Sequence, residues 1–172
     1  WQQDQALYLH IPFCVQKCLY CDFASYAGFG EQAKRDYTDA VCKEIALRAD
    51  EAANMAANAS IYFGGGTPSF FGADGISTIL ATIRRNFDVD SNAEITVECN
   101  PDSVDWRSIA RLRRAGVNRI SLGAQTADPQ QLRCLHRIHS TRQVVQAVAD
   151  IRRAKITNLS LDLIYGLPDQ DM

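Results

Sequence analysis

The chain has 172 residues, of which 47% are hydrophobic and 22% are charged, and its formal net charge is -2 at pH 7. This composition is typical of a globular domain with a sizeable apolar core. The charges are balanced and spread along the chain, which argues against a nucleic-acid partner. The sequence contains no apolar run of about 18 residues and no signal-peptide pattern. We therefore expect a cytoplasmic protein without a transmembrane segment.

Cysteines are unevenly distributed along the chain. Three are clustered near the N-terminus, and the other three are scattered, at Cys42, Cys99 and Cys134. A cluster of this kind in a chain that reads as an intracellular enzyme favours a metal site over a disulfide framework. We expect the three scattered cysteines to pack as ordinary residues.

Strand-like and helix-like runs alternate from one end of the chain to the other. Apolar, strand-like runs cover residues 7–13, 60–63, 94–100, 119–125 and 159–165. Helix-like runs cover residues 31–56, 74–86, 105–115 and 141–154, with a short helical turn after Pro129. The last begins at a capping box formed by Ser140 and Gln143, and Gly116 is placed to end the third. This alternation predicts an α/β fold with a parallel sheet of about five strands.

Every second residue is polar in four of the five predicted strands. Because strand side chains alternate between the two faces, these polar residues share one face of the sheet. In the third predicted strand they are Glu94, Thr96, Glu98 and Asn100. A doubly wound sheet would need apolar residues on both faces. The pattern instead predicts a partial parallel (β/α) barrel whose concave face binds a polar ligand.

The chain begins at Trp1 and ends soon after the fifth predicted strand. We therefore expect residues 1–172 to form one incomplete barrel domain, with further barrel units and a C-terminal domain missing.

The clustered cysteines Cys14, Cys18 and Cys21 have the spacing C-x3-C-x2-C and follow the first predicted strand. A structural zinc site needs four ligands, and a common [4Fe-4S] cluster takes four cysteines. Three thiolates would leave one iron of a cubane cluster open to a further ligand. A zinc loop and a disulfide loop are the alternatives.

The residues around these cysteines carry a family resemblance. The segments YLHIPFC and CLYCDF, which end at Cys14 and surround Cys21, resemble the radical SAM enzymes. Within that superfamily they resemble the branch of oxygen-independent coproporphyrinogen III oxidase. The resemblance implies a [4Fe-4S] cluster whose open iron binds S-adenosylmethionine, and reductive cleavage of that cofactor.

A glycine-rich segment, Gly64-Gly65-Gly66-Thr67-Pro68-Ser69, follows the second predicted strand. Glycines allow a ligand to approach the backbone closely, and successive amides can bind a carboxylate. A tight strand-to-helix turn would explain the glycines equally well. The segment resembles the GGE-type motif of radical SAM proteins, which binds the methionine amine of the cofactor.

Further candidate residues lie at or beyond the ends of later predicted strands, where the ligands of parallel barrels bind. Glu98 lies in an E-x-N-P segment that resembles the family. The resemblance implies that Tyr8, Gly65 and Glu98 contact the S-adenosylmethionine bound to the cluster. It also implies a second set of residues that contact a second molecule of the cofactor: Tyr20, Gly66, Thr67, Gln125, Arg137 and Asp162.

One position departs from the oxidase pattern. Oxidases of this branch carry a cysteine two residues after the third, where this chain has Phe23. The C-D-F sequence resembles a sister subgroup of heme chaperones. We therefore expect a protein that binds heme and delivers it to an acceptor protein, such as a respiratory one. The alternatives are an oxygen-independent coproporphyrinogen III oxidase and a radical SAM enzyme with another substrate. The implied partners are heme or a porphyrinogen, and an electron donor for the cluster.

Overall fold

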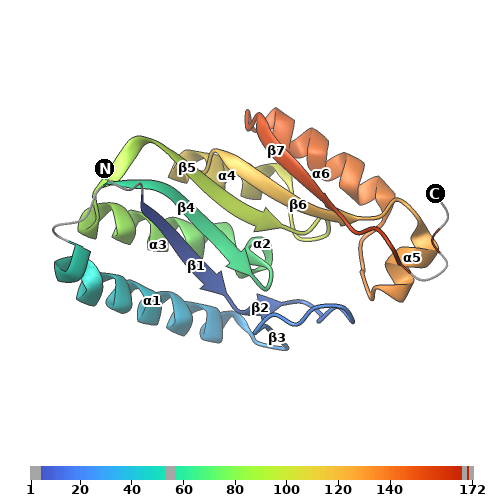
Figure 1. Ribbon diagram of the computed structural model, residues 1–172, viewed down its shortest axis with the longest axis horizontal. Helices are drawn as coiled ribbons and strands as arrows, with labels where there is room; N and C mark the ends of the chain where they lie inside the picture. Colours follow the sequence, from blue (N-terminus) through green and yellow to red (C-terminus); the bar gives the residue numbers. More distant parts are fainter. Residues whose placement is uncertain (1–4, 53–56, 168–169, 171–172) are drawn as a thin grey trace.

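The computed structural model describes residues 5–52, 57–167 and 170, with a five-stranded parallel sheet at its centre (Figure 1). The sheet strands are β1 (Gln5–Ile11), β4 (Asn58–Gly65), β5 (Val89–Cys99), β6 (Arg119–Gln125) and β7 (Asn158–Leu163). They are hydrogen-bonded in the order β1-β4-β5-β6-β7, so each new strand is added at the same edge. All pairs are parallel. The α/β prediction of five parallel strands is confirmed.

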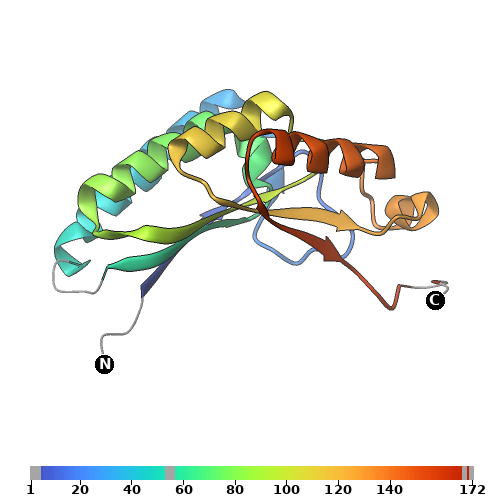
Figure 2. The same ribbon diagram turned by 90° about the horizontal axis from the view of Figure 1, so that it is seen from above.

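Helices connect the strands and lie on one face of the sheet. The four long ones are α1 (Glu31–Ala52), α3 (Ala73–Asn86), α4 (Trp106–Ala115) and α6 (Thr141–Arg153). Seen from above, the sheet curves beneath this layer of helices, and no helix of the described residues covers its other face (Figure 2). None of the helices in the described ranges is both long and apolar enough to cross a membrane.

The core lies between the helices and the sheet. Ile61, Phe63, Val97, Ile120 and Leu122 of the strands are fully buried there. The polar residues that alternate with them face the concave side, as the strand pattern predicts. The alternation of apolar and polar residues along each strand therefore places the apolar set in the core and the polar set on the concave face.

Local sequence signals explain where two of the helices begin and end. Asp105 and Ser108 form a capping box at the start of α4, and Ser140 and Gln143 form the predicted one at the start of α6. These pairs satisfy backbone N–H groups that have no partner inside the helix. Gly116 ends α4 in the left-handed conformation, with φ of 107°. A residue with a Cβ would be strained there.

The sequence analysis did not predict several of the short elements. The two-residue strands β2 (Phe13–Cys14) and β3 (Tyr26–Ala27) pair with each other, and α2 (Pro68–Phe71) follows the glycine segment. The helix α5 (Pro129–Cys134) is the predicted turn after Pro129. Elements of two to four residues are too short to show a hydrophobic period. Strand β5 begins earlier than predicted, and the predicted end of the first helix lies outside the described residues.

Candidate functional site

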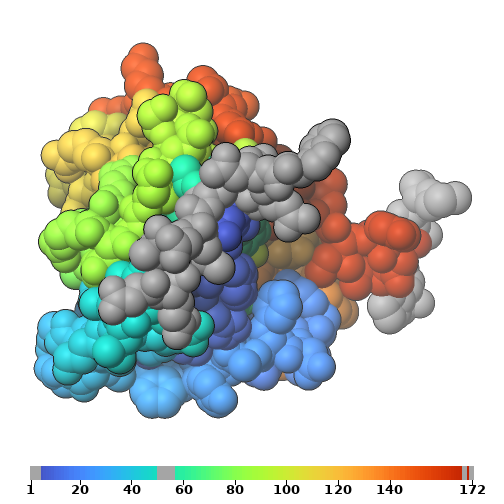
Figure 3. Space-filling view, turned by 60° about the vertical axis from the view of Figure 1, so that its left-hand side comes forward, coloured from blue at the N-terminus to red at the C-terminus, as the bar shows by residue number. Residues whose placement is uncertain are grey.

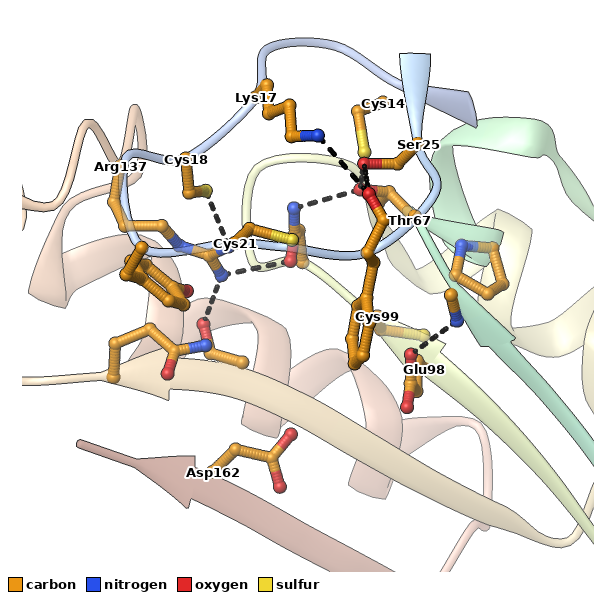
Figure 4. Close-up of a pocket in the computed structure, with 18 of the residues that line it drawn as sticks. Cys14, Lys17, Cys18, Cys21, Ser25, Thr67, Glu98, Cys99, Arg137 and Asp162 are labelled. Atoms are coloured by element: carbon orange, nitrogen blue, oxygen red, sulfur yellow. Dashed lines mark hydrogen bonds between the residues drawn. The ribbon is translucent and has the colours of Figure 1, made fainter. Parts of the chain in front are cut away.

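A cavity of about 530 Å³ opens at the carboxyl ends of β4, β5, β6 and β7. Its volume lies within the range of about 300–1,000 Å³ that is usual for small-molecule sites. All predicted site residues except Tyr8 line it, and they come from the cysteine loop, the strand ends and the segment after α5. Figure 4 shows the cysteine loop on one side of this space, with Glu98 and Asp162 on the strands opposite.

Tyr8 lies elsewhere. It lines a separate cavity of about 370 Å³ between β1 and α1, together with His10 and Tyr37. Its ring stacks on Tyr62 with 6.1 Å between centroids, and its hydroxyl lies 3.3 Å from His10 Nδ1. The predicted contact of Tyr8 with the cofactor stays a prediction.

Of the three clustered cysteines, Cys14 ends β2, and Cys18 and Cys21 lie on the loop that joins β2 to β3. Pairing of these short strands closes the loop, and the backbone N–H of Tyr26 donates to Pro12 O at 2.8 Å. A turn from Cys18 to Cys21 brings their backbones within 3.2 Å. The surface position of the segment between β1 and α1 is visible in blue in Figure 3. The loop therefore directs several thiols toward one cavity.

All six cysteines carry free thiols, and no disulfide alternative is realised among the described residues. Within residues 5–52, 57–167 and 170, no three His, Cys, Asp or Glu side chains converge closely enough to hold a single metal ion. A cubane cluster distributes its cysteine ligands over different irons, so it requires no such convergence.

A fourth cysteine, Cys99, also lines the cavity, although sequence reasoning gave it no role. Its side chain is only 3% exposed, and burial raises the pKa of its thiol to about 12. Metal ligation requires the thiolate. Burial therefore keeps the Cys99 thiol protonated at neutral pH in the metal-free chain.

The glycine turn is packed tightly against the first strands. Gly65 has φ of 109°, and a Cβ on it would lie 2.7 Å from the His10 ring. A Cβ on Gly66 would lie 2.8 Å from the backbone oxygens of both Ile11 and Phe13. The N–H of Gly66 donates to Ile11 O at 2.7 Å, and that of Thr67 donates to Phe13 O at 2.7 Å. These contacts hold the glycine turn beside the cysteine loop.

The carboxylate of Glu98 is held by two donors at the end of β5. Tyr62 Oη donates to Glu98 Oε1 at 2.8 Å, and the Gly65 N–H donates to Oε2 at 3.2 Å. Burial raises the pKa of Glu98, and these two hydrogen bonds oppose that rise. Tyr62 was not predicted as a site residue. Its position two residues before the glycine segment, on the same strand face as Gly64, is the signal that could have indicated it.

The carboxylate of Asp162 lies on β7, across the cavity from Glu98. Ser121 Oγ lies 2.9 and 3.0 Å from its two oxygens, and Ser160 Oγ lies 3.1 Å from Ser121 Oγ. At the end of β6, Gln125 has φ of 65°. A positive φ in a residue other than glycine is uncommon and often marks a functional position.

Two hydrogen-bond donors reach the cysteine sulfurs from outside the loop. Arg137 Nη1 lies 3.5 Å from Cys18 Sγ, and Thr67 Oγ1 lies 3.6 Å from Cys14 Sγ. Near them, burial raises the pKa of Tyr20 to about 12, and the positive charge of Arg137 partly opposes that rise. The cavity thus combines the three thiols of the cysteine cluster with two carboxylates and a guanidinium.

Comparison with known protein families identifies the cofactors that this combination of groups binds. The family model of the Radical SAM superfamily matches residues 8–172. The chain belongs to this superfamily. Radical SAM proteins use a [4Fe-4S] cluster and S-adenosylmethionine, which are therefore the cofactors of this chain. The donor set fits both, because three thiols suit the cluster and charged groups of both signs suit the amine, carboxylate and sulfonium of S-adenosylmethionine.

Two kinds of curated relatives resemble the chain over nearly all of its length. The heme chaperone HemW of Escherichia coli is 38% identical over 167 residues, which are 97% of this chain and 44% of the relative. The oxygen-independent coproporphyrinogen III oxidase of Bradyrhizobium diazoefficiens is 37% identical over 165 residues, which are 96% of this chain and 37% of the relative. The chain thus spans less than half of the length of these relatives.

Solved structures agree with the fold. Coproporphyrinogen III oxidase (HemN) from Escherichia coli, a radical SAM enzyme, superposes with a TM-score of 0.89 at 30% identity. The match covers 99% of this chain and 39% of that one. Elp3 of Methanocaldococcus infernus superposes with a TM-score of 0.60 at 13% identity, a likeness of fold alone. The partial (β/α) barrel of the radical SAM type is confirmed.

Proposed function

We propose that Cys14, Cys18 and Cys21 each bind one iron of the [4Fe-4S] cluster, and that S-adenosylmethionine occupies the adjoining cavity at the fourth iron. The proposal is supported by the three free thiols of Cys14, Cys18 and Cys21, which line one cavity. When bound, this cofactor pair supplies a low-potential electron and a carbon–sulfur bond that the electron can cleave.

The side chains of the chain orient the cofactor in this proposal. Glu98, held by Tyr62 and Gly65, accepts hydrogen bonds from the donors of the cofactor at one side of the cavity. Asp162, held by Ser121, does so at the other side. Each carboxylate has partners on its own sheet, so little conformational freedom is lost when the cofactor binds.

We further propose that the whole protein binds heme and delivers it to an acceptor protein in the cytoplasm or at a respiratory enzyme, with an electron donor reducing the cluster. The observation that carries this choice is Phe23. It lines the cavity, with 58% of its side chain exposed, at the position where the oxidases of this branch have a cysteine. The similarity to heme chaperones named HemW supports the same choice.

The second candidate is an oxygen-independent coproporphyrinogen III oxidase. One observation favours it: every residue predicted to contact a second molecule of S-adenosylmethionine lines the one cavity. The similarity to HemN, which reaches a TM-score of 0.89, also agrees with it.

Two assays on the anaerobically reconstituted, full-length protein separate the candidates. Heme is added in the first, and coproporphyrinogen III with S-adenosylmethionine and a reductant in the second. A stable Soret band without protoporphyrinogen supports heme delivery. Formation of decarboxylated product overturns it in favour of the oxidase. Cys14→Ser serves as the control, because loss of the cluster in this variant tests the ligand assignment separately.

A further inference from the structure

Asn100, the asparagine of the E-x-N-P segment, lines the cavity, although the sequence analysis gave it no role. It follows β5 directly and precedes Pro101, and a residue before proline is restricted to extended backbone. Its backbone N–H donates to Ser69 Oγ at 3.0 Å, and Ser69 is hydrogen-bonded to Ser103. The backbone of Asn100 is therefore held in place before its side chain makes any contact.

The side-chain amide of Asn100 contacts Arg137 and Thr67 at once. Its Oδ1 accepts from Arg137 Nη2 at 2.9 Å, and its Nδ2 donates to Thr67 Oγ1 at 3.3 Å. Thr67 in turn donates to Cys14 Sγ, and Arg137 donates to Cys18 Sγ. One amide thus links two donors that reach two different cysteines.

The packing around Arg137 and Thr67 restricts the hydrogen-bond partners that these two side chains can reach. Arg137 Nη2 also donates to Gly123 O at 2.8 Å, and a Cβ at Gly123 would lie 2.7 Å from that same nitrogen. Thr67 is only 5% exposed. The acceptor on Asn100 orients the guanidinium, and its donor occupies one lone pair of the Thr67 oxygen, which directs the hydroxyl hydrogen toward Cys14.

We infer that Asn100 is a positioning residue that sets the reduction potential of the cluster by holding Thr67 and Arg137 against the thiolates of Cys14 and Cys18. The inference rests on the cluster assignment in the proposed function and is independent of heme. Hydrogen bonds to the cysteine sulfurs are among the groups that tune such potentials. They stabilise the reduced cluster more than the oxidised one, because the reduced cluster carries one more negative charge. Loss of Asn100 therefore lowers the potential.

The test is a redox titration of the reconstituted full-length protein, followed by electron paramagnetic resonance. The variants are Asn100→Leu, which keeps the shape of the side chain without its amide, and Asn100→Ala. Weakening one hydrogen bond to a charged group changes an equilibrium about tenfold. For a one-electron couple a tenfold change corresponds to about 59 mV, so we expect a midpoint potential lower by roughly that amount. Asn158→Ala is the matched control, since it removes a hydrogen bond to Glu94 on the same sheet away from the cysteines.

A double-mutant cycle with Thr67→Val tests whether Asn100 acts through Thr67. The potential should shift less when Asn100→Leu is added to Thr67→Val than when it is added to the wild type. Fully additive shifts, or a wild-type potential in Asn100→Leu, would overturn the inference.

Measurements of iron content and thermal unfolding separate a positioning role of Asn100 from a purely structural role. A variant at Asn100 that unfolds and loads iron like the wild type but has the lower potential supports the inference, because only the contacts to the thiolates are then changed. Loss of iron together with a collapsed unfolding transition would make Asn100 a purely structural residue. If Cys14→Ser and Cys18→Ser both retain full iron, the cluster assignment fails and this inference fails with it. If they lose iron while Asn100→Leu keeps its potential, the inference alone is wrong.

Discussion

The hydroxyl of Tyr62 is the group that most directly maintains the charged form of Glu98. Burial favours the protonated carboxyl of Glu98, and the 2.8 Å hydrogen bond from Tyr62 opposes this by stabilising the carboxylate. Hydrogen bonds to charged groups contribute about 1.5–3 kcal/mol, and we take about 1 kcal/mol because Glu98 is partly exposed to water. Tyr62→Phe should therefore lower the free energy of unfolding by about 1 kcal/mol where the carboxyl is ionised.

The sign of the pH dependence follows from linkage. Because the folded pKa of Glu98 lies above its unfolded value, its contribution to stability is present below the unfolded pKa and is lost as pH rises through the folded pKa. Tyr62→Phe enlarges that loss, so the difference from the wild type should be greater at about pH 8 than at about pH 4.5. Urea unfolding of the cluster-free protein at the two pH values measures it.

The same substitution should weaken the binding of S-adenosylmethionine. If Glu98 must be ionised to accept hydrogen bonds from the cofactor, a cost of about 1 kcal/mol corresponds to roughly fivefold weaker binding. Tyr37→Phe is the control, because the Tyr37 hydroxyl donates to the backbone oxygen of His10 and does not contact Glu98. Equal effects of the two substitutions, or a Tyr62→Phe effect that is the same at both pH values, would refute the reasoning.

Three further predictions concern the surroundings of the site. Gly66→Ala should cost about 1–3 kcal/mol in urea unfolding, because its Cβ meets backbone oxygens of Ile11 and Phe13; an unchanged midpoint would contradict the packing. Cys99 should react far more slowly with iodoacetamide at pH 8 than the other thiols of the metal-free chain, since its pKa is about 12, and Cys99→Ser should keep the full iron content. Burial, followed by the charge of Arg137, lowers the pKa of His139. The free energy of unfolding should therefore fall as pH drops below about 6.5. His139→Gln should remove this pH dependence in urea unfolding measured across the same range.

The strands, the long helices and the candidate cavity were predictable because their signals are local. Alternation of polar and apolar residues identified the strands and the concave face, and the capping residues identified the start of α6. Because parallel strands end at one edge of the sheet, Glu98 and Asp162 could be expected in one cavity before the register was known. The short pair β2 and β3 was missed because two residues carry no periodicity.

The sequence by itself indicated the family, the three cysteines and many of the residues that line the cavity. A ligand loop of C-x3-C-x2-C needs only neighbours along the chain. The tertiary structure decided which groups contact one another. Arg137 reaches Cys18 although 119 positions separate them in sequence. Burial, and not position in a motif, raises the pKa of Cys99. Such contacts depend on strand register and on the approach of loops in space, and neither is encoded in the spacing of residues along one segment.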